Sequence, residues 1–252
     1  NNGQHVIFRV GTSTLSNYLL INQGVYSTDA DVPVDPTTGL RYRSASGEYF
    51  KAGDPIWFDR NGDYVLDNRD YARTGNSQPL ITGGMQNSFS YKNFQFSIYA
   101  SYTAKRTIMN NALAQRLGLM TNPTGQGGDN KAVIPLDDIA IWRQIGDVAK
   151  YPNPYDYTRN GSINPFRYDQ TLWAENGSYF KINNIIVAYM FGRDVLRRYG
   201  LERLRIFGSL DNVVTFSKYS GPNPENVTSM GRDLSEGYPV PRTYNLGLNI
   251  TF

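Results

Sequence analysis

One stretch of the chain places oxygen-bearing side chains at the spacing of a calcium-binding loop. It reads DRNGDYVLDNRD, residues 59–70. Positions 1, 3, 5, 7, 9 and 12 of such a loop hold Asp59, Asn61, Asp63, the backbone carbonyl of Val65, Asp67 and Asp70. Calcium prefers hard oxygen ligands that wrap around the ion, so this spacing predicts a calcium site.

The same loop also departs from the usual calcium-binding pattern. Its glycine stands at the fourth position as Gly62, Tyr64 occupies the sixth position where glycine is usual, and Asp70 replaces a bidentate glutamate. The alternative interpretation is therefore a metal-free turn, in which the side chains of Asp59 and Asn61 hydrogen-bond to the backbone.

Residue types needed for most other chemistry are scarce. The chain has no cysteine and a single histidine, His5, which excludes thiolate metal sites, disulfides and multi-histidine zinc sites. We expect no enzymatic activity. With 25 basic and 22 acidic residues and no clustering of Lys and Arg along the sequence, we also expect no nucleic-acid partner.

Alternation of apolar and polar residues predicts the strands. Residues 83–102 read as a hairpin with its turn at Lys92–Asn93, and residues 178–191 and 203–216 read as a second pair joined by a short helical turn that ends near Gly200. The last strand is 242–252. One of its sides carries Tyr244, Leu246, Leu248, Ile250 and Phe252. A shorter alternation at 4–10 is a candidate sixth strand.

Long connections separate these strand pairs. Residues 11–80, 103–177 and 217–241 are rich in polar and turn-forming residues, whereas the turns at 92–93 and 192–202 are short. Short periplasmic turns that alternate with long external loops are typical of outer-membrane β-barrels. The longest apolar run, 185–191, has seven residues, against about 20 for a membrane-spanning helix. Five or six strands do not close a barrel, since the smallest have about eight.

Five motifs in a fixed order carry a family resemblance. They are GDPIWFDRNGDYVLDNRD at 53–70, TGGMQNSFSYKNFQFSIYASY at 82–102, WAENGSYFKINNIIVAYMF at 173–191, LRIFGSLDNVVTFSKYSGPNPE at 204–225 and YPVPRTYNLGLNITF at 238–252. Together they resemble the C-terminal part of SusC/RagA-type TonB-dependent outer-membrane transporters of Bacteroidota.

This resemblance implies an all-β fold, a segment of an antiparallel transmembrane β-barrel with long extracellular loops. Residues 1–252 would be the C-terminal portion of the barrel domain and supply the last five or six strands of a 22-stranded wall. We expect the signal peptide, the TonB box and the plug to lie upstream, outside this chain. The implied function is TonB-dependent import of oligosaccharides or peptides across the outer membrane of a Gram-negative bacterium.

The resemblance also implies partners. They are a SusD-like surface lipoprotein that acts as a lid, the TonB complex, the barrel-assembly machinery and the lipid bilayer. The assembly machinery would read the apolar side of the last strand, from Tyr244 to Phe252, and the same side would face lipid.

A second hypothesis is a soluble calcium-dependent carbohydrate-binding module, because aromatic residues accompany the aspartate loop. Side chains that would stack on sugar rings or contact a lid are Trp57, Trp142, Tyr151, Tyr155, Tyr157 and Trp173. Most tyrosines are better explained as the aromatic girdles of a barrel.

Overall fold

The computed structural model describes residues 10–120, 139–161, 163–234 and 238–252, which form two compact units. We call them the sheet unit, formed by the described residues of Gln78–Ile108, Asn176–Val227 and Ser235–Phe252, and the loop unit, formed by those of Asn1–Ser77, Met109–Glu175 and Thr228–Leu234.

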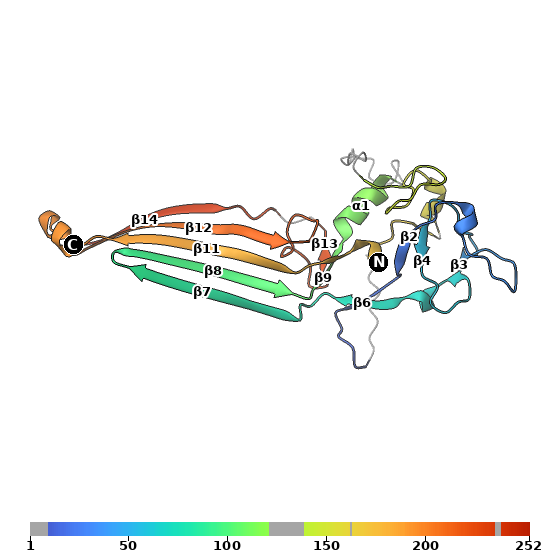
Figure 1. Ribbon diagram of the computed structural model, residues 1–252, viewed down its shortest axis with the longest axis horizontal. Helices are drawn as coiled ribbons and strands as arrows, with labels where there is room; N and C mark the ends of the chain where they lie inside the picture. Colours follow the sequence, from blue (N-terminus) through green and yellow to red (C-terminus); the bar gives the residue numbers. More distant parts are fainter. Residues whose placement is uncertain (1–9, 121–138, 162, 235–237) are drawn as a thin grey trace. The chain divides into compact units, whose positions relative to one another are not determined.

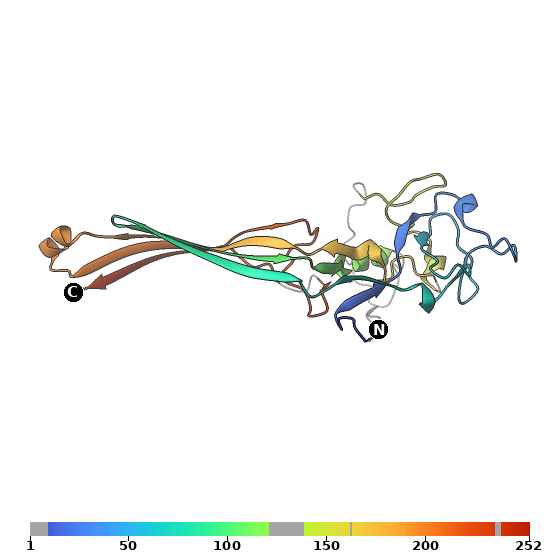
Figure 2. The same cartoon turned by 60° about the horizontal axis from the view of Figure 1, so that its bottom comes forward.

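The sheet unit is built on one antiparallel sheet with the strand order β14-β12-β11-β8-β7 (Figure 1). Its strands are β7 Ile81–Tyr91, β8 Phe94–Ala104, β11 Tyr179–Met190, β12 Arg203–Ser217 and β14 Thr243–Thr251. The four strand segments and the C-terminal strand predicted from the sequence are thereby confirmed. The sheet is strongly twisted along its length (Figure 2), as expected for L-residues in strands. The sixth candidate, 4–10, lies outside the described residues except for Val10.

Two short connections join strands at one end of the sheet. Lys92 adopts a left-handed backbone conformation, with φ of 52°, in the two-residue turn between β7 and β8, as a tight hairpin requires. Between β11 and β12, the helix α2 Arg193–Leu196 continues into a 3-10 turn, η5 Arg197–Tyr199. Gly200, with φ of 67°, then ends this turn as predicted.

The pairing register gives the sheet an apolar face. Phe89 lies opposite Phe96, Phe96 opposite Val187, and Gly208 opposite Leu246, so apolar side chains form rows across all five strands. Many large apolar side chains of this face are exposed: Met85, Phe89, Phe94, Phe96, Phe180, Val187, Ile206, Phe216, Leu246 and Leu248. The other face is more polar and carries serines, asparagines and threonines, together with Tyr99, Ile186 and Phe207.

The long connections expected from the sequence are not open loops, because much of their length folds into the loop unit. Its short strands are β1 Ser16–Leu19, β2 Asn22–Val25, β3 Arg43–Ser44, β4 Pro55–Trp57, β5 Val65–Leu66, β6 Ala72–Asn76, β9 Thr107–Asn110, β10 Ala174–Asn176 and β13 Arg232–Asp233. Within β9 and β10 the chain passes from one unit to the other. They pair as β1-β6, β2-β4, β3-β5 and β10-β9-β13. Its helices are α1 Asn111–Met120 and the 3-10 turns η1 Asp29–Asp31, η2 Asn68–Asp70, η3 Tyr157–Asn160 and η4 Thr171–Trp173. Among the described residues, no helix is both long enough and apolar enough to span a membrane.

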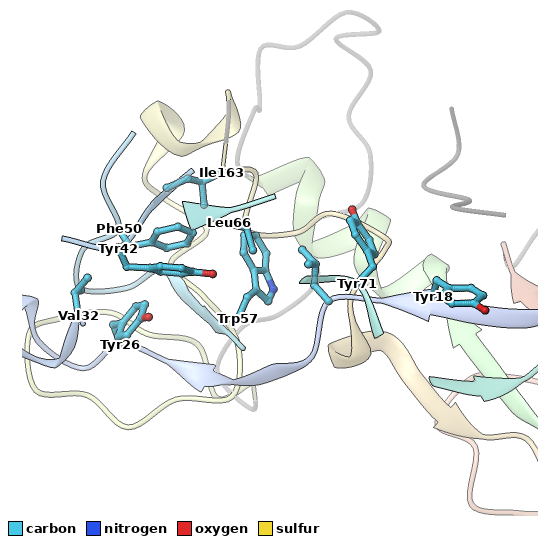
Figure 3. Packing of buried hydrophobic residues seen from close by; sticks show 10 residues of the cluster. Tyr18, Tyr26, Val32, Tyr42, Phe50, Trp57, Leu66, Tyr71 and Ile163 are labelled. Atoms are coloured by element: carbon cyan, nitrogen blue, oxygen red, sulfur yellow. The ribbon is translucent and has the colours of Figure 1, made fainter. Parts of the chain in front are cut away.

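Aromatic side chains hold the loop unit together (Figure 3). Phe50 stacks on Tyr42 with ring centroids 4.7 Å apart and meets Trp57 edge-on at 5.9 Å. A second cluster contains Met109, Leu117 and Trp173, all fully buried. These residues follow neither a two-residue nor a helical period. Their burial was therefore not visible in the sequence pattern.

Candidate functional site

The aspartate loop of residues 59–70 is organised by hydrogen bonds from its own backbone. The Asp59 carboxylate accepts the N–H groups of Gly62 at 2.7 Å and Tyr64 at 2.8 Å, and Asp63 accepts the N–H of Val65 at 3.0 Å. Tyr64 adopts a left-handed conformation with φ of 58°. The sixth position therefore has the conformation that usually favours glycine, although it holds tyrosine.

The end of the loop is closed by reciprocal capping around η2. Asp70 accepts the N–H groups of Asp67 at 2.8 Å and Arg60 at 3.0 Å, and Asp67 accepts the N–H of Arg69 at 2.7 Å. Asp70 is fully buried. Burial raises the pKa of its carboxyl above the ordinary value, although both backbone hydrogen bonds act in the opposite direction.

An arginine supplies positive charge to this loop. The Arg69 guanidinium lies 2.5 Å from an Asp63 oxygen and 2.7 Å from an Asp67 oxygen. Its hydrogen bond to Asp67 lowers the pKa of that carboxyl. Within the described ranges, no three His, Asp or Glu side chains converge as a metal site. For the predicted calcium ligands to gather around an ion, Arg69 has to release Asp63 and Asp67.

The second predicted site is the C-terminal strand. β14 pairs with β12 in continuous register from Thr243 opposite Asp211 to Thr251 opposite Arg203. Tyr244, Leu246, Leu248 and Ile250 lie on the apolar face, where Leu246 is 85% exposed. Phe252 follows the strand and is also exposed. The structure thus places four of the five predicted residues on the apolar side of the edge strand β14, and the fifth, Phe252, directly after it.

The polar face opposite this stripe carries its own hydrogen-bond network. Asp211 on β12 accepts the side-chain amides of Asn184 at 2.5 Å and Asn245 at 3.0 Å. Nearby, Asn183 donates to the Ser101 hydroxyl at 2.8 Å. The pairing of β11 shifts register between Ile182 and Asn184 on both sides, which marks a β-bulge beside this network.

A buried ion pair ties distant parts of the loop unit together. Arg159 pairs with the buried Asp54 and, at 2.6 Å, with Glu48, and it donates to the carbonyl of Tyr49. About 105 residues separate Arg159 from Asp54 in the sequence. Loss of either buried partner leaves an uncompensated charge, so this contact fixes the position of η3.

A second buried network surrounds Asp169. Its carboxylate pairs with Arg167 at 2.5 Å and accepts the Tyr71 hydroxyl, and the Arg167 guanidinium lies 5.5 Å above the Trp57 ring. Trp57 in turn donates its indole N–H to Gln170 at 2.9 Å. Burial alone would raise the pKa of Asp169, but Arg167 and Tyr71 lower it more, so it lies below the ordinary value.

Two members of this network, Tyr71 and Arg167, line an open recess of about 350 Å³ in the loop unit. Its lining includes Ser44, Leu66, Asp67, Tyr71 and Arg167. Arg167 and Tyr71 could not be recognised from the sequence, since nothing in their spacing shows that they meet.

The aromatic residues considered for cargo or lid contacts divide into two groups. Trp57, Trp142, Tyr151 and Trp173 are buried. They pack inside the loop unit and do not offer a ring face for stacking. Tyr155 and Tyr157 are exposed, so their rings are accessible for stacking.

Curated proteins similar to the chain share one designation. TonB-dependent receptor P39 of Formosa agariphila is 27% identical over 216 residues, which cover 82% of this chain and 20% of that protein. TonB-dependent receptor P3 of the same organism is 26% identical over 259 residues, which cover 99% of this chain and 23% of that protein. TonB-dependent receptor SusC of Bacteroides thetaiotaomicron is 22% identical over a stretch that covers 84% of this chain and 19% of that protein. No protein-family model matches the chain.

Solved structures agree with these relatives. A chain of the RagAB peptide transporter superposes with a TM-score of 0.59 at 18% sequence identity, covering 94% of this chain and 22% of the other. A chain of the RagAB peptide importer in its open-open state superposes with a TM-score of 0.58 at 16% sequence identity. Our chain therefore has the fold of a partial antiparallel β-barrel, and it spans about a fifth of the length of the relatives that it matches.

Proposed function

We propose, from the relationship of this chain to SusC/RagA-type TonB-dependent outer-membrane transporters, that it forms part of the barrel wall and external loops of a nutrient importer. In this proposal the chain is the C-terminal portion of a multi-pass barrel in the outer membrane of a Gram-negative bacterium. The plug and the TonB contact would belong to other parts of the protein.

The observation that carries the proposal is the two-sided sheet. Every strand of the sheet unit contributes apolar side chains to one face, and much of that face is exposed. Contiguous apolar surface of this kind marks a contact with lipid or protein. Alternation of apolar and polar residues, as along β7, β8 and β14, is the pattern that a barrel wall needs between lipid and an aqueous lumen.

The alternative, a soluble calcium-dependent carbohydrate-binding module, fits less well. Such a module would bury the apolar face of its sheet against a second layer, as sandwiches do. Exposed Leu246, Leu248 and Phe89 contradict that arrangement in the described residues.

The cargo and the lid are the finer parts of the proposal. RagAB is described as a peptide importer, and SusC is a TonB-dependent receptor. We propose that the whole protein imports oligosaccharides or peptides and works with a SusD-like surface lipoprotein. The loop unit, with exposed Tyr155 and Tyr157, would contribute to the external side where cargo and lid bind.

Two site assignments complete the proposal. Tyr244, Leu246, Leu248, Ile250 and Phe252 would form the signal that the barrel-assembly machinery reads. Calcium, if bound by residues 59–70, would replace Arg69 as the cation between Asp63 and Asp67.

Fractionation of cells that make the full protein containing this chain tests the proposal. We expect the protein in the outer-membrane fraction and a folded form whose gel mobility changes on heating. Leu248→Asp should lower that fraction several-fold, because it places a charge on the lipid face. Asn249→Asp, its neighbour on the polar face, is the matched control and should keep it. A protein that stays in the soluble fraction would contradict the proposal.

A further inference from the structure

Arginines gather at the short connection between β11 and β12. Residues 193–205 contain five arginines and only two acidic residues, Asp194 and Glu202. This surplus is as large as the formal net charge of +3 of the whole chain. The expectation that basic residues are not clustered along the sequence is therefore wrong for this segment.

Three of these arginines share one cavity. A volume of about 520 Å³ is lined by Arg193, Arg197, Leu201, Glu202, Arg203 and Thr251. Arg193 and Arg197 come from the α2–η5 turn, whereas Arg203 and Thr251 are paired residues at the ends of β12 and β14. The cavity is thus built from the α2–η5 turn and the ends of β12 and β14, and the pairing of these two strands holds Arg203 opposite Thr251.

The cations in this cavity lack counter-ions. In the part of the chain that the structure describes, no ion pair involves Arg193, Arg197 or Arg203. Glu202 is the one carboxylate in the lining. Guanidinium groups that share a cavity repel one another unless an anion lies between them.

We propose that this cavity, the arginine pocket, binds a phosphate group. Guanidinium forks match phosphate oxygens with paired hydrogen bonds, and such charge-assisted bonds are stronger than neutral ones. The volume is larger than a bare phosphate needs and falls in the range of pockets for small organic ligands, about 300–1,000 Å³. A phosphate that carries an organic group therefore fits the pocket better than a small inorganic anion.

Two sources of that phosphate are compatible with the surroundings. Val195 and Tyr199 are 51% and 75% exposed on the same turn, and apolar and tyrosine side chains beside arginines are typical of segments at a membrane surface. This favours a phospholipid headgroup. Arg203 and Thr251, however, lie on the polar face of the sheet, which a soluble phosphate reaches from water. The inference rests on the cavity and its charges and does not depend on transport.

Calorimetric titration of the full protein in a maltoside detergent at low salt tests the inference. The probes are inorganic phosphate, dihexanoyl phosphatidylglycerol and dihexanoylglycerol, which has the same acyl chains without phosphate. Binding of both phosphate probes means that the free group suffices, and binding of the phospholipid alone identifies the headgroup as the source. Both outcomes support the arginine pocket. Binding of neither, or equal binding of dihexanoylglycerol, would overturn it.

Substitutions of lining residues test whether the phosphate probe binds in the arginine pocket. The double variant R193Q/R197Q should bind the phosphate probe about tenfold or more weakly, whereas R198Q, which removes an arginine of the same turn outside the lining, should change affinity less than about twofold. E202Q removes the single carboxylate and should strengthen binding several-fold. Heat-modifiable gel mobility shows that each variant is folded. Unchanged binding by E202Q and by R193Q/R197Q would refute the assignment.

Discussion

Arg69 is the residue that decides between the two interpretations of the aspartate loop. It holds Asp63 and Asp67 with its guanidinium, so the loop already contains a cation. The backbone hydrogen bonds of Asp59 and Asp70 keep the loop folded around it. The spacing of aspartates was visible in the sequence, but the competition between Arg69 and a metal ion was not.

Replacing Arg69 should expose that competition. We expect Arg69→Ala to bind calcium several-fold more tightly than the unmodified protein, because two carboxylates lose their internal cation. The measurement is the calcium-dependent shift in thermal unfolding, followed by tryptophan fluorescence. All three tryptophans of this chain, Trp57, Trp142 and Trp173, lie in the loop unit.

Arg73→Ala is the control for this experiment, since it removes an equal charge from an exposed position of β6. It should leave the calcium response unchanged. If calcium shifts the unfolding of neither the unmodified protein nor Arg69→Ala, calcium binding by residues 59–70 is wrong.

Asp169 should make the stability of the loop unit sensitive to acid. Its folded-state pKa lies below that of an unfolded aspartate, about 3.9, so it stabilises the fold fully above that value and loses this contribution as pH falls through the folded pKa. Asp169→Asn should lower the free energy of unfolding by about 2–4 kcal/mol near neutral pH, because Arg167 loses its partner.

Urea unfolding of both proteins between pH 7 and pH 3 measures this effect. The difference in stability between unmodified protein and Asp169→Asn should shrink toward the acidic end. A difference that stays constant over the whole range would show that the Asp169 carboxylate does not contribute through its charge.

Elements with a regular period were predictable, and those without one were not. Alternation over about ten residues identified β7, β8 and β14, since each has one apolar side. β11 and β12 are also long and rich in apolar residues, although residues 185–190 of β11 are apolar on both sides. The loop unit depends on single aromatic residues and on pairs such as Arg159 and Asp54, which lie far apart in the sequence. A strand of two or three residues has too few positions to show a period, so β3, β4 and β5 were missed.

Glycine and aromatic residues meet across the strands of the sheet. A Cβ atom at Gly247 would lie 2.2 Å from the ring of Phe207, its partner on β12, whereas a Cβ at Gly208 would meet only a backbone oxygen at 3.8 Å. Gly247→Ala should therefore destabilise the folded barrel by about 1–3 kcal/mol, because Phe207 has to move. Gly208→Ala should change stability by less than about 0.5 kcal/mol.

The loss of the folded, heat-modifiable form in rising urea compares the two variants. Equal stability of Gly247→Ala and Gly208→Ala would show that the Phe207 ring adjusts without cost, and that the contact does not support the β12–β14 pairing.

The last residue tests the role of β14 in assembly. Deletion of Phe252 should lower the outer-membrane level of the full protein several-fold, since it removes one residue of the proposed assembly signal. Phe252→Trp keeps a large aromatic side chain and should retain most of that level. Immunoblots of outer-membrane fractions give the comparison, and equal levels in all three proteins would remove Phe252 from the signal.

At the scale of the whole molecule, the described sheet is incomplete. β7 and β14 form its two edges and each pairs on one side only within the described residues. Open edges and an exposed apolar face both call for further partners, which a closed barrel in a bilayer supplies. The chain spans about a fifth of its relatives, so the remaining wall strands would come from the rest of the protein.

The orientation of β14 in the bilayer would show whether its apolar side faces lipid, as the proposed barrel wall requires. We would place single cysteines, on a background without other cysteines, at positions 243, 244, 245, 246, 248, 249 and 250 of the full protein, label them with a nitroxide and measure collisions with oxygen and with a water-soluble nickel complex. We expect high oxygen accessibility at 244, 246, 248 and 250 and low values at 243, 245 and 249. Water accessibility at every position, or no two-residue alternation, would contradict this orientation.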